Sequence, residues 1–156
     1  MKTNRASKRF TVVIFILTAF MMLFAWVHSC FPADLSSQES EGFMALISGL
    51  FKLFGITHEM SGLLIRKLAH FTEFSAIGAL LLSCAYCFDR VRPHRYFVQV
   101  LFSGLLSAVI DETIQLFSEG RAGMITDVWI DMGGVVFGSA LAWLFYAVVR
   151  RVKHIS

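Results

Sequence analysis

Four long apolar segments are the feature of this sequence that most restricts its fold. They run from Phe10 to Phe31, from Leu63 to Phe88, from Tyr96 to Phe117 and from Met124 to Val149. A helix needs about 20 mostly apolar residues to cross a hydrocarbon core of about 30 Å, and each segment meets that length. We therefore predict an all-α integral membrane protein with four transmembrane helices.

The composition agrees with this prediction. Of the 156 residues, 56% are apolar and only 16% are charged, which is more apolar side chain than one soluble domain of this size buries. The two prolines, Pro32 and Pro93, both lie between the predicted spans, where a residue that cannot continue a helix does least harm. No segment remains for a soluble domain that binds nucleic acid, so that function is excluded.

Basic residues gather at one side of the predicted spans. They precede the first span, they fill the link between the second and third with Arg90, Arg92 and Arg95, and they follow the fourth, which accounts for ten of the 14 in the chain. An even number of spans places these segments on one side, and the positive-inside rule makes that side the cytoplasm. We predict a multi-pass cell-membrane protein with both termini in the cytoplasm.

The predicted spans divide the chain into five parts. Residues 1–9 form a basic N-terminal segment, and residues 10–31 form an anchor helix that is too long for the core of a cleaved signal peptide. Residues 32–62 form an outer loop, in which the apolar residues 43–56 are too short to cross and are predicted to lie as a helix in the outer interface. Three further spans occupy residues 63–149, and a basic tail follows at residues 150–156.

Ionisable side chains interrupt three of the spans at a common depth. Counted from the cytoplasmic ends, Glu73 and Asp111 each lie about 22 Å up their spans and Asp131 lies about 27 Å up the fourth. Charges at such depth are costly unless they pair, face the bundle interior or line a wet cavity, so they are functional candidates. This polar layer consists of Arg66, Lys67, His70, Glu73, Asp111, Glu112, Gln115, Arg121, Asp127 and Asp131.

Small residues continue the polar faces of the last two spans. In the fourth span Gly134, Gly138 and Ala142 follow Asp127 and Asp131 at helical spacing, and the third span has the same design. Small residues let helices approach closely. We therefore predict that the acidic side chains converge inside the bundle, and the same faces offer a contact surface for an oligomer.

Two stretches, "RKLAHFTEFSAIGALLL" and "DETIQLFSEGRAGMITDVWIDMGGVVFG", resemble the VanZ family of small bacterial membrane proteins. That family is named for a member associated with resistance to the lipoglycopeptide teicoplanin. The resemblance covers about residues 63–149 and implies a protein of the bacterial cell envelope that lowers susceptibility to teicoplanin; it supplies no reaction. The matching positions are Lys67, Ala69, His70, Phe71, Glu73, Asp111, Glu112, Gln115, Arg121, Asp127, Asp131 and Gly134.

The first hypothesis for the polar layer is lipid binding at the outer leaflet. Arg66, Lys67 and Arg121 would take the phosphate or carboxylate of an anionic head group or of a lipid-linked cell-wall precursor, and the acidic side chains would orient these bases. Binding at this depth also places the protein where a lipoglycopeptide anchors its acyl chain. The expected partners are therefore membrane lipids, a lipid-linked precursor or the lipoglycopeptide itself.

Three alternatives to lipid binding stay open. In a membrane-embedded enzyme, His70 would act with Glu73 or Asp111 as acid and base, or the layer would hold magnesium, manganese or zinc. The sequence assigns no catalytic residue, cofactor or metal among these. The carboxylates would also serve proton-coupled transport, or the nearly balanced charges would form a structural salt-bridged plug.

Overall fold

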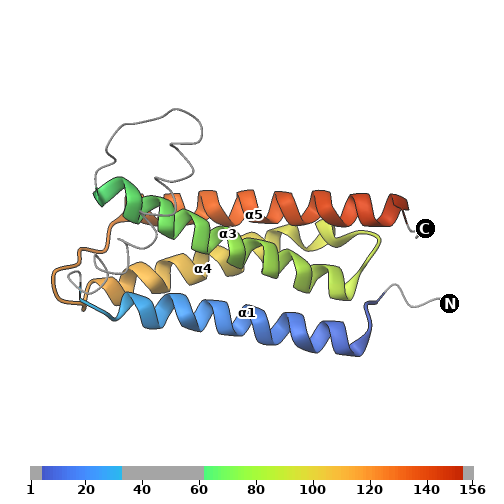
Figure 1. The fold of residues 1–156 in the computed structure, drawn as a ribbon, viewed down its shortest axis with the longest axis horizontal. Coiled ribbons are helices and arrows are strands. Elements are labelled where there is room, and N and C mark those ends of the chain that lie inside the picture. The colour runs from blue at the N-terminus through green and yellow to red at the C-terminus, as the bar shows by residue number, and fades with distance from the viewer. Residues whose placement is uncertain (1–4, 33–61, 153–156) are drawn as a thin grey trace, which may run out of the picture.

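The computed structural model describes residues 5–32 and 62–152, and the interfacial helix predicted for residues 43–56 lies outside these ranges. Four long helices run side by side (Figure 1): α1 (Lys8–Ser29), α3 (Gly62–Phe88), α4 (Phe97–Gln115) and α5 (Ile125–Val152). Each is long and apolar enough to cross a membrane when the short helix η1 (Pro93–Tyr96) is counted with α4. The predicted all-α fold with four membrane-spanning helices is thus confirmed, and the spans agree to within three residues at each end.

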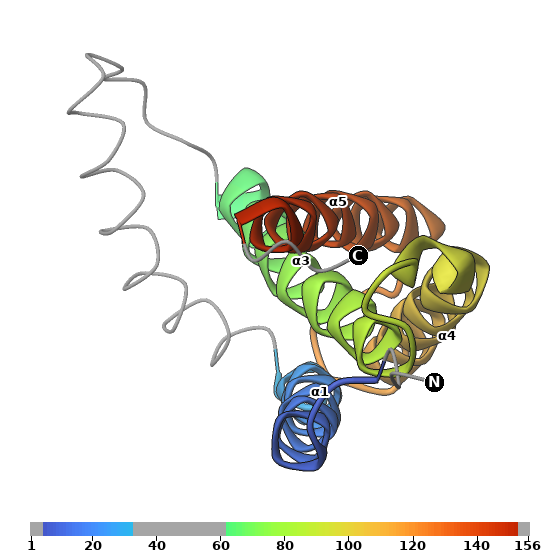
Figure 2. The same ribbon diagram turned by 90° about the vertical axis from the view of Figure 1, so that its right-hand side faces the viewer.

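Helix α3 lies in the middle of the bundle. It packs against α1, α4 and α5, and its most extensive contact is with α5 (Figure 2). Small residues make this close contact, because a Cβ atom added at Gly138 would overlap the backbone of Ser75 and one added at Gly134 would overlap the carbonyl of Phe71. The close approach predicted from the small residues of the fourth span is therefore present, and its partner is α3.

The basic segments meet at one end of the bundle, the basic end. The backbone N–H of Ala6, just before α1, donates to the carbonyl of Cys87 near the end of α3 at 3.2 Å. The Arg150 guanidinium near the end of α5 donates to the carbonyl of Val91 in the α3–α4 link. This arrangement is what an even number of crossings requires; the cytoplasmic location of the basic end stays a prediction.

Apolar packing fills the bundle between the basic end and the opposite, polar end. Near the basic end the buried group consists of Leu82, Ala85, Tyr86, Val100, Ala142 and Tyr146. Toward the polar end a second buried group consists of Ala25, Phe74, Ile77, Ala108 and Val135. Large apolar side chains such as Ile16, Val98 and Trp129 are exposed on the outside of the bundle, which suits contact with lipid.

Candidate functional site

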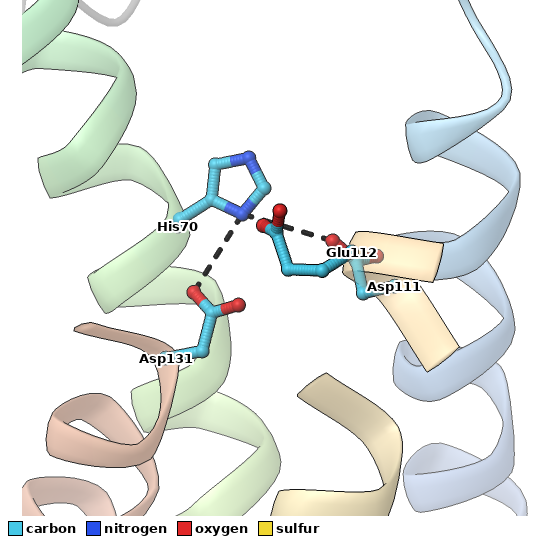
Figure 3. Close-up of side chains that lie close together, drawn as sticks. All are labelled: His70, Asp111, Glu112 and Asp131. Atoms are coloured by element: carbon cyan, nitrogen blue, oxygen red, sulfur yellow. Dashed lines mark ion pairs between the residues drawn. The ribbon is translucent and has the colours of Figure 1, made fainter. Parts of the chain in front are cut away.

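Four side chains from three helices meet at the polar end and form the carboxylate–histidine cluster: His70 of α3, Asp111 and Glu112 of α4, and Asp131 of α5 (Figure 3). One nitrogen or oxygen atom from each residue lies within 4.8 Å of those from the other three. All four residues are buried. The convergence predicted from depth and helical spacing is therefore present for these four members of the polar layer.

The packing just beneath the cluster explains its position. Phe74 and Val135 lie one helical turn below His70 and Asp131, and both are fully buried. A Cβ atom at Gly104 of α4 would overlap the side chain of Val135, so α4 also approaches α5 closely at this level. The apolar layer thus closes the cluster off from the interior toward the basic end.

His70 lies between two carboxylates without a hydrogen bond to either. Its Nδ1 atom is 3.7 Å from Asp131 Oδ1 and 3.9 Å from Asp111 Oδ2, which is longer than an N–H···O hydrogen bond (Figure 3). Asp131 is 0% exposed, and among the described residues neither of its carboxylate oxygens has a hydrogen-bond partner. A buried polar atom without a partner costs about 1–3 kcal/mol, so this side of the cluster is incompletely satisfied.

The α4 carboxylates are held by several hydrogen bonds. The Ser29 hydroxyl at the end of α1 donates to Asp111 Oδ1 at 2.7 Å. Gln115 Nε2 donates to Asp111 Oδ2 at 2.9 Å and to Glu112 Oε1 at 3.0 Å. The backbone N–H of Met124, just before α5, donates to Glu112 Oε2 at 2.9 Å. These donors fix the direction in which both carboxylates point.

Asp127 belongs to a separate charged group, although it lies on the same face of α5 as Asp131. Lys67 Nζ donates to Asp127 Oδ1 at 3.0 Å, and an Arg66 guanidinium nitrogen lies 3.6 Å from Asp127 Oδ2. Asp127 is buried, whereas the two basic side chains are about a third exposed, at 33% for Arg66 and 30% for Lys67. The predicted polar layer is therefore divided between this basic group and the carboxylate–histidine cluster.

Arg121 approaches the cluster from the α4–α5 connection, where Gly120 adopts a left-handed φ of 71°. Its guanidinium donates to the carbonyl of His28 at 3.5 Å, while Nε and Nη1 have no hydrogen-bond partner in the described part of the chain. Burial lowers the pKa of the Arg121 guanidinium from its ordinary value, and the nearby charge of Arg66 adds to this effect. Glu73 also lies near, and its buried Oε1 has no partner within the described ranges.

Helix α1 contributes to the site, although its sequence did not predict such a role. Ser29 donates to Asp111, and its carbonyl accepts from the Ser118 hydroxyl at 2.6 Å. The carbonyl of His28 accepts from Arg121. The available signal was position, because Ser29 and His28 end the first span at the depth of the polar layer. These contacts couple α1 to the loop that carries Arg121.

A double-mutant cycle on Lys67→Gln and Asp127→Asn tests the basic group. We expect each single variant to lower the free energy of unfolding in mixed micelles, and the double variant to lose less than the sum of the two. The coupling should be about 0.5–1 kcal/mol, because the ion pair is partly exposed. Additive losses would show that the pair does not form.

Residues 11–146 match the model of the VanZ/LLP1 family. The matched region extends from α1 to the last two turns of α5 and contains all ten predicted members of the polar layer. No match was found among the curated proteins or the solved structures.

Proposed function

Because the chain belongs to the VanZ/LLP1 family, we propose that it acts in the bacterial cell membrane by binding the anionic head group of a lipid or of a lipid-linked cell-wall precursor. The protein is a membrane protein with four apolar helices. In this proposal its polar end faces outward, and head-group binding there lowers the susceptibility of the cell to teicoplanin.

The partly exposed basic pair beside Asp127, Arg66 and Lys67, is the observation that carries the proposal. Arg66 and Lys67 both approach Asp127, and about a third of each side chain stays accessible. A lysine ammonium has three donors and a guanidinium has five, so among residues 5–32 and 62–152 the contacts with Asp127 leave donors for phosphate or carboxylate oxygens. Asp127 holds the two bases together, which prepares them to bind one anion.

An apolar groove beside the same turn of α5 supports the lipid part of the proposal. The groove has a volume of about 290 Å³ and lies between α4 and α5. Glu112 is the charged residue in its wall and is also a member of the carboxylate–histidine cluster. Glu112 also interacts electrostatically with Arg66, so an acyl chain in the groove would bring its head group toward the basic pair. The apolar part of the wall includes Leu105, Val109, Leu116, Val128 and Trp129.

Lipid retention by the purified full-length chain tests this proposal. We expect the wild type in mild detergent to retain phosphatidylglycerol or a polyprenyl-phosphate lipid, measured by native mass spectrometry and lipid extraction. Lys67→Gln combined with Arg66→Gln should weaken retention by about tenfold or more, because each lost charge-assisted hydrogen bond is worth about 1.5–3 kcal/mol.

Arg95→Gln is the matched control, since it removes an exposed basic side chain from the basic end. This variant should leave the retention of anionic lipid at the polar end unchanged. The proposal is wrong if the wild type retains no anionic lipid, or if the control weakens retention as much as the double variant does.

An acid–base enzyme that acts on a lipid-linked substrate is the second candidate. The position of His70 Nδ1 between Asp111 and Asp131 favours it, because a histidine beside carboxylates is suited to proton transfer. Turnover of a polyprenyl-phosphate substrate by the wild type, and its loss in His70→Gln, would place this function above simple binding.

Proton-coupled transport has less support. The two buried apolar groups occupy the bundle between the carboxylate–histidine cluster and the basic end. They leave no chain of ionisable side chains through the described helices, which a proton relay needs. Proton flux into liposomes that depends on Asp111 would be required to support transport.

A further inference from the structure

We propose that His70, Asp111, Glu112 and Asp131 bind one divalent transition-metal ion, Mn²⁺ or Zn²⁺, between α3, α4 and α5. The inference is separate from the lipid proposal, because it concerns the buried cluster and not the partly exposed basic pair. A site with one imidazole nitrogen and several carboxylate oxygens suits these ions better than Ca²⁺ or Mg²⁺, which prefer oxygen ligands alone.

The distances within the cluster match those between ligands of a shared ion. Zinc lies about 2.0–2.2 Å from nitrogen and carboxylate oxygen ligands, so two ligands at the tetrahedral angle are about 3.4 Å apart. The distances from His70 Nδ1 are 3.7 Å to Asp131 Oδ1 and 3.9 Å to Asp111 Oδ2 (Figure 3). One ligand atom from each of the four residues lies within 4.8 Å of those from the others, so shifts of about an ångström, within the reach of side-chain rotation, would complete the coordination.

Unsatisfied buried atoms provide a second, independent argument. Asp131 is 0% exposed and His70 is 8% exposed. Neither Asp131 oxygen, nor the Nδ1 atom of His70, has a hydrogen-bond partner among residues 5–32 and 62–152. These three atoms point toward the centre of the cluster (Figure 3). A single cation would satisfy them together and remove the cost of burying them alone.

The remaining two carboxylates are oriented as metal ligands usually are. Asp111 accepts from Ser29 Oγ and Gln115 Nε2, and Glu112 accepts from Gln115 Nε2 and the Met124 backbone N–H. Each carboxylate oxygen has two lone pairs, so a hydrogen-bonded oxygen still has one for a metal. Hydrogen bonds of this kind fix the orientation of ligands and strengthen metal affinity.

The charge balance also favours a cation. In the described part of the chain, Lys67 and Arg66 form their salt bridges with Asp127, and no lysine or arginine forms one with the three carboxylates of the cluster. Arg121 interacts electrostatically with Asp111 and Glu112. Three carboxylates carry three negative charges, which a divalent ion and the Arg121 guanidinium would neutralise in a region of low dielectric.

Metal analysis of the full-length protein tests the inference directly. The protein is purified in detergent through a tag without histidines, stripped with EDTA and titrated with Mn²⁺ or Zn²⁺, with no lipid added. We expect about one equivalent of metal per chain by elemental mass spectrometry, and a rise in melting temperature on metal addition. Binding of Mn²⁺ is followed independently by loss of the free-ion electron paramagnetic resonance signal.

Two variants remove ligands while keeping side-chain size. Asp131→Asn and His70→Gln should each weaken Mn²⁺ binding by at least roughly 10- to 100-fold and abolish the thermal shift. Loss of a residue that only hydrogen-bonds a metal ligand already weakens binding by this range. Asp89→Asn is the control, because it removes a carboxylate at the basic end, where Asp89 accepts from the backbone of Val91 and Arg92, and not from the cluster. It should bind metal as the wild type does.

Folding of the variants is checked in EDTA by helical circular dichroism and size-exclusion chromatography. The inference is overturned if folded wild type takes up no stoichiometric metal, or if Asp131→Asn and His70→Gln bind it as tightly as the wild type. Loss of lipid retention in the Arg66 and Lys67 variants with metal content unchanged would support two separate sites. Metal binding without lipid retention would leave this inference standing and reject the lipid proposal.

Discussion

Gly138→Ala is expected to destabilise the bundle by about 2–3 kcal/mol, a large effect for one methyl group. The added Cβ would overlap the backbone of Ser75, which cannot move aside as a flexible side chain can. Helices α3 and α5 would have to separate, and the contact from Ser139 Oγ to the Gly78 carbonyl, now 3.1 Å, would lengthen. Denaturant unfolding in mixed micelles measures the loss of unfolding free energy as a shift of the transition midpoint.

Gly133→Ala is the control for this experiment, because it makes the same chemical change on the same helix. A Cβ atom at Gly133 would meet the Phe71 ring at 3.6 Å, an ordinary contact, so its effect should stay within about 0.5 kcal/mol. If the two variants behave alike, close packing between α3 and α5 does not hold the bundle together.

Arg66→Gln combined with Lys67→Gln is expected to abolish protection against teicoplanin while leaving the fold intact, because in the proposed function these two bases bind the anionic head group. Protection is measured as the susceptibility of a sensitive Gram-positive host that expresses each protein at matched membrane abundance, with vancomycin for comparison. The wild type should protect against teicoplanin selectively. Both bases are about a third exposed and contact Asp127, so replacing them with glutamine should change stability by only about 1 kcal/mol.

Asp89→Asn is the control, since Asp89 accepts hydrogen bonds from the backbone of Val91 and Arg92 at the basic end, far from the cluster. It should protect as the wild type does. Equal protection by the double variant would show that Arg66 and Lys67 do not bind the head group on which protection depends. No protection by the wild type would reject the teicoplanin part of the proposed function.

Much of the site could be predicted from the sequence because depth in a membrane follows from counting residues. His70, Asp111, Glu112 and Asp131 were all placed at one level, and the structure brings them within a few ångströms. The pairing of charges was not predictable in this way. Asp127 and Asp131 share one face of α5, yet the first contacts two basic side chains and the second lies beside His70.

The contribution of α1 was missed for a related reason. Ser29 is one of many small polar residues in the sequence, and only the folded chain places its hydroxyl 2.7 Å from Asp111, which is 82 residues away. Its position at the end of the first span is compatible with a role in the site but does not indicate one. Contacts between distant residues decide which of the residues at one depth meet.

The sequence by itself determined the number of membrane spans, their bounds to within a few residues and the level of the polar layer. These follow from hydrophobic length and helical rise, which depend on each segment alone. Only the tertiary structure decided which carboxylates surround His70 and which carboxylate Arg66 and Lys67 contact. It also decided that α1 contributes to the site. Those choices depend on how each helix is rotated about its axis, and the rotation is set by contacts such as that between Gly138 and Ser75.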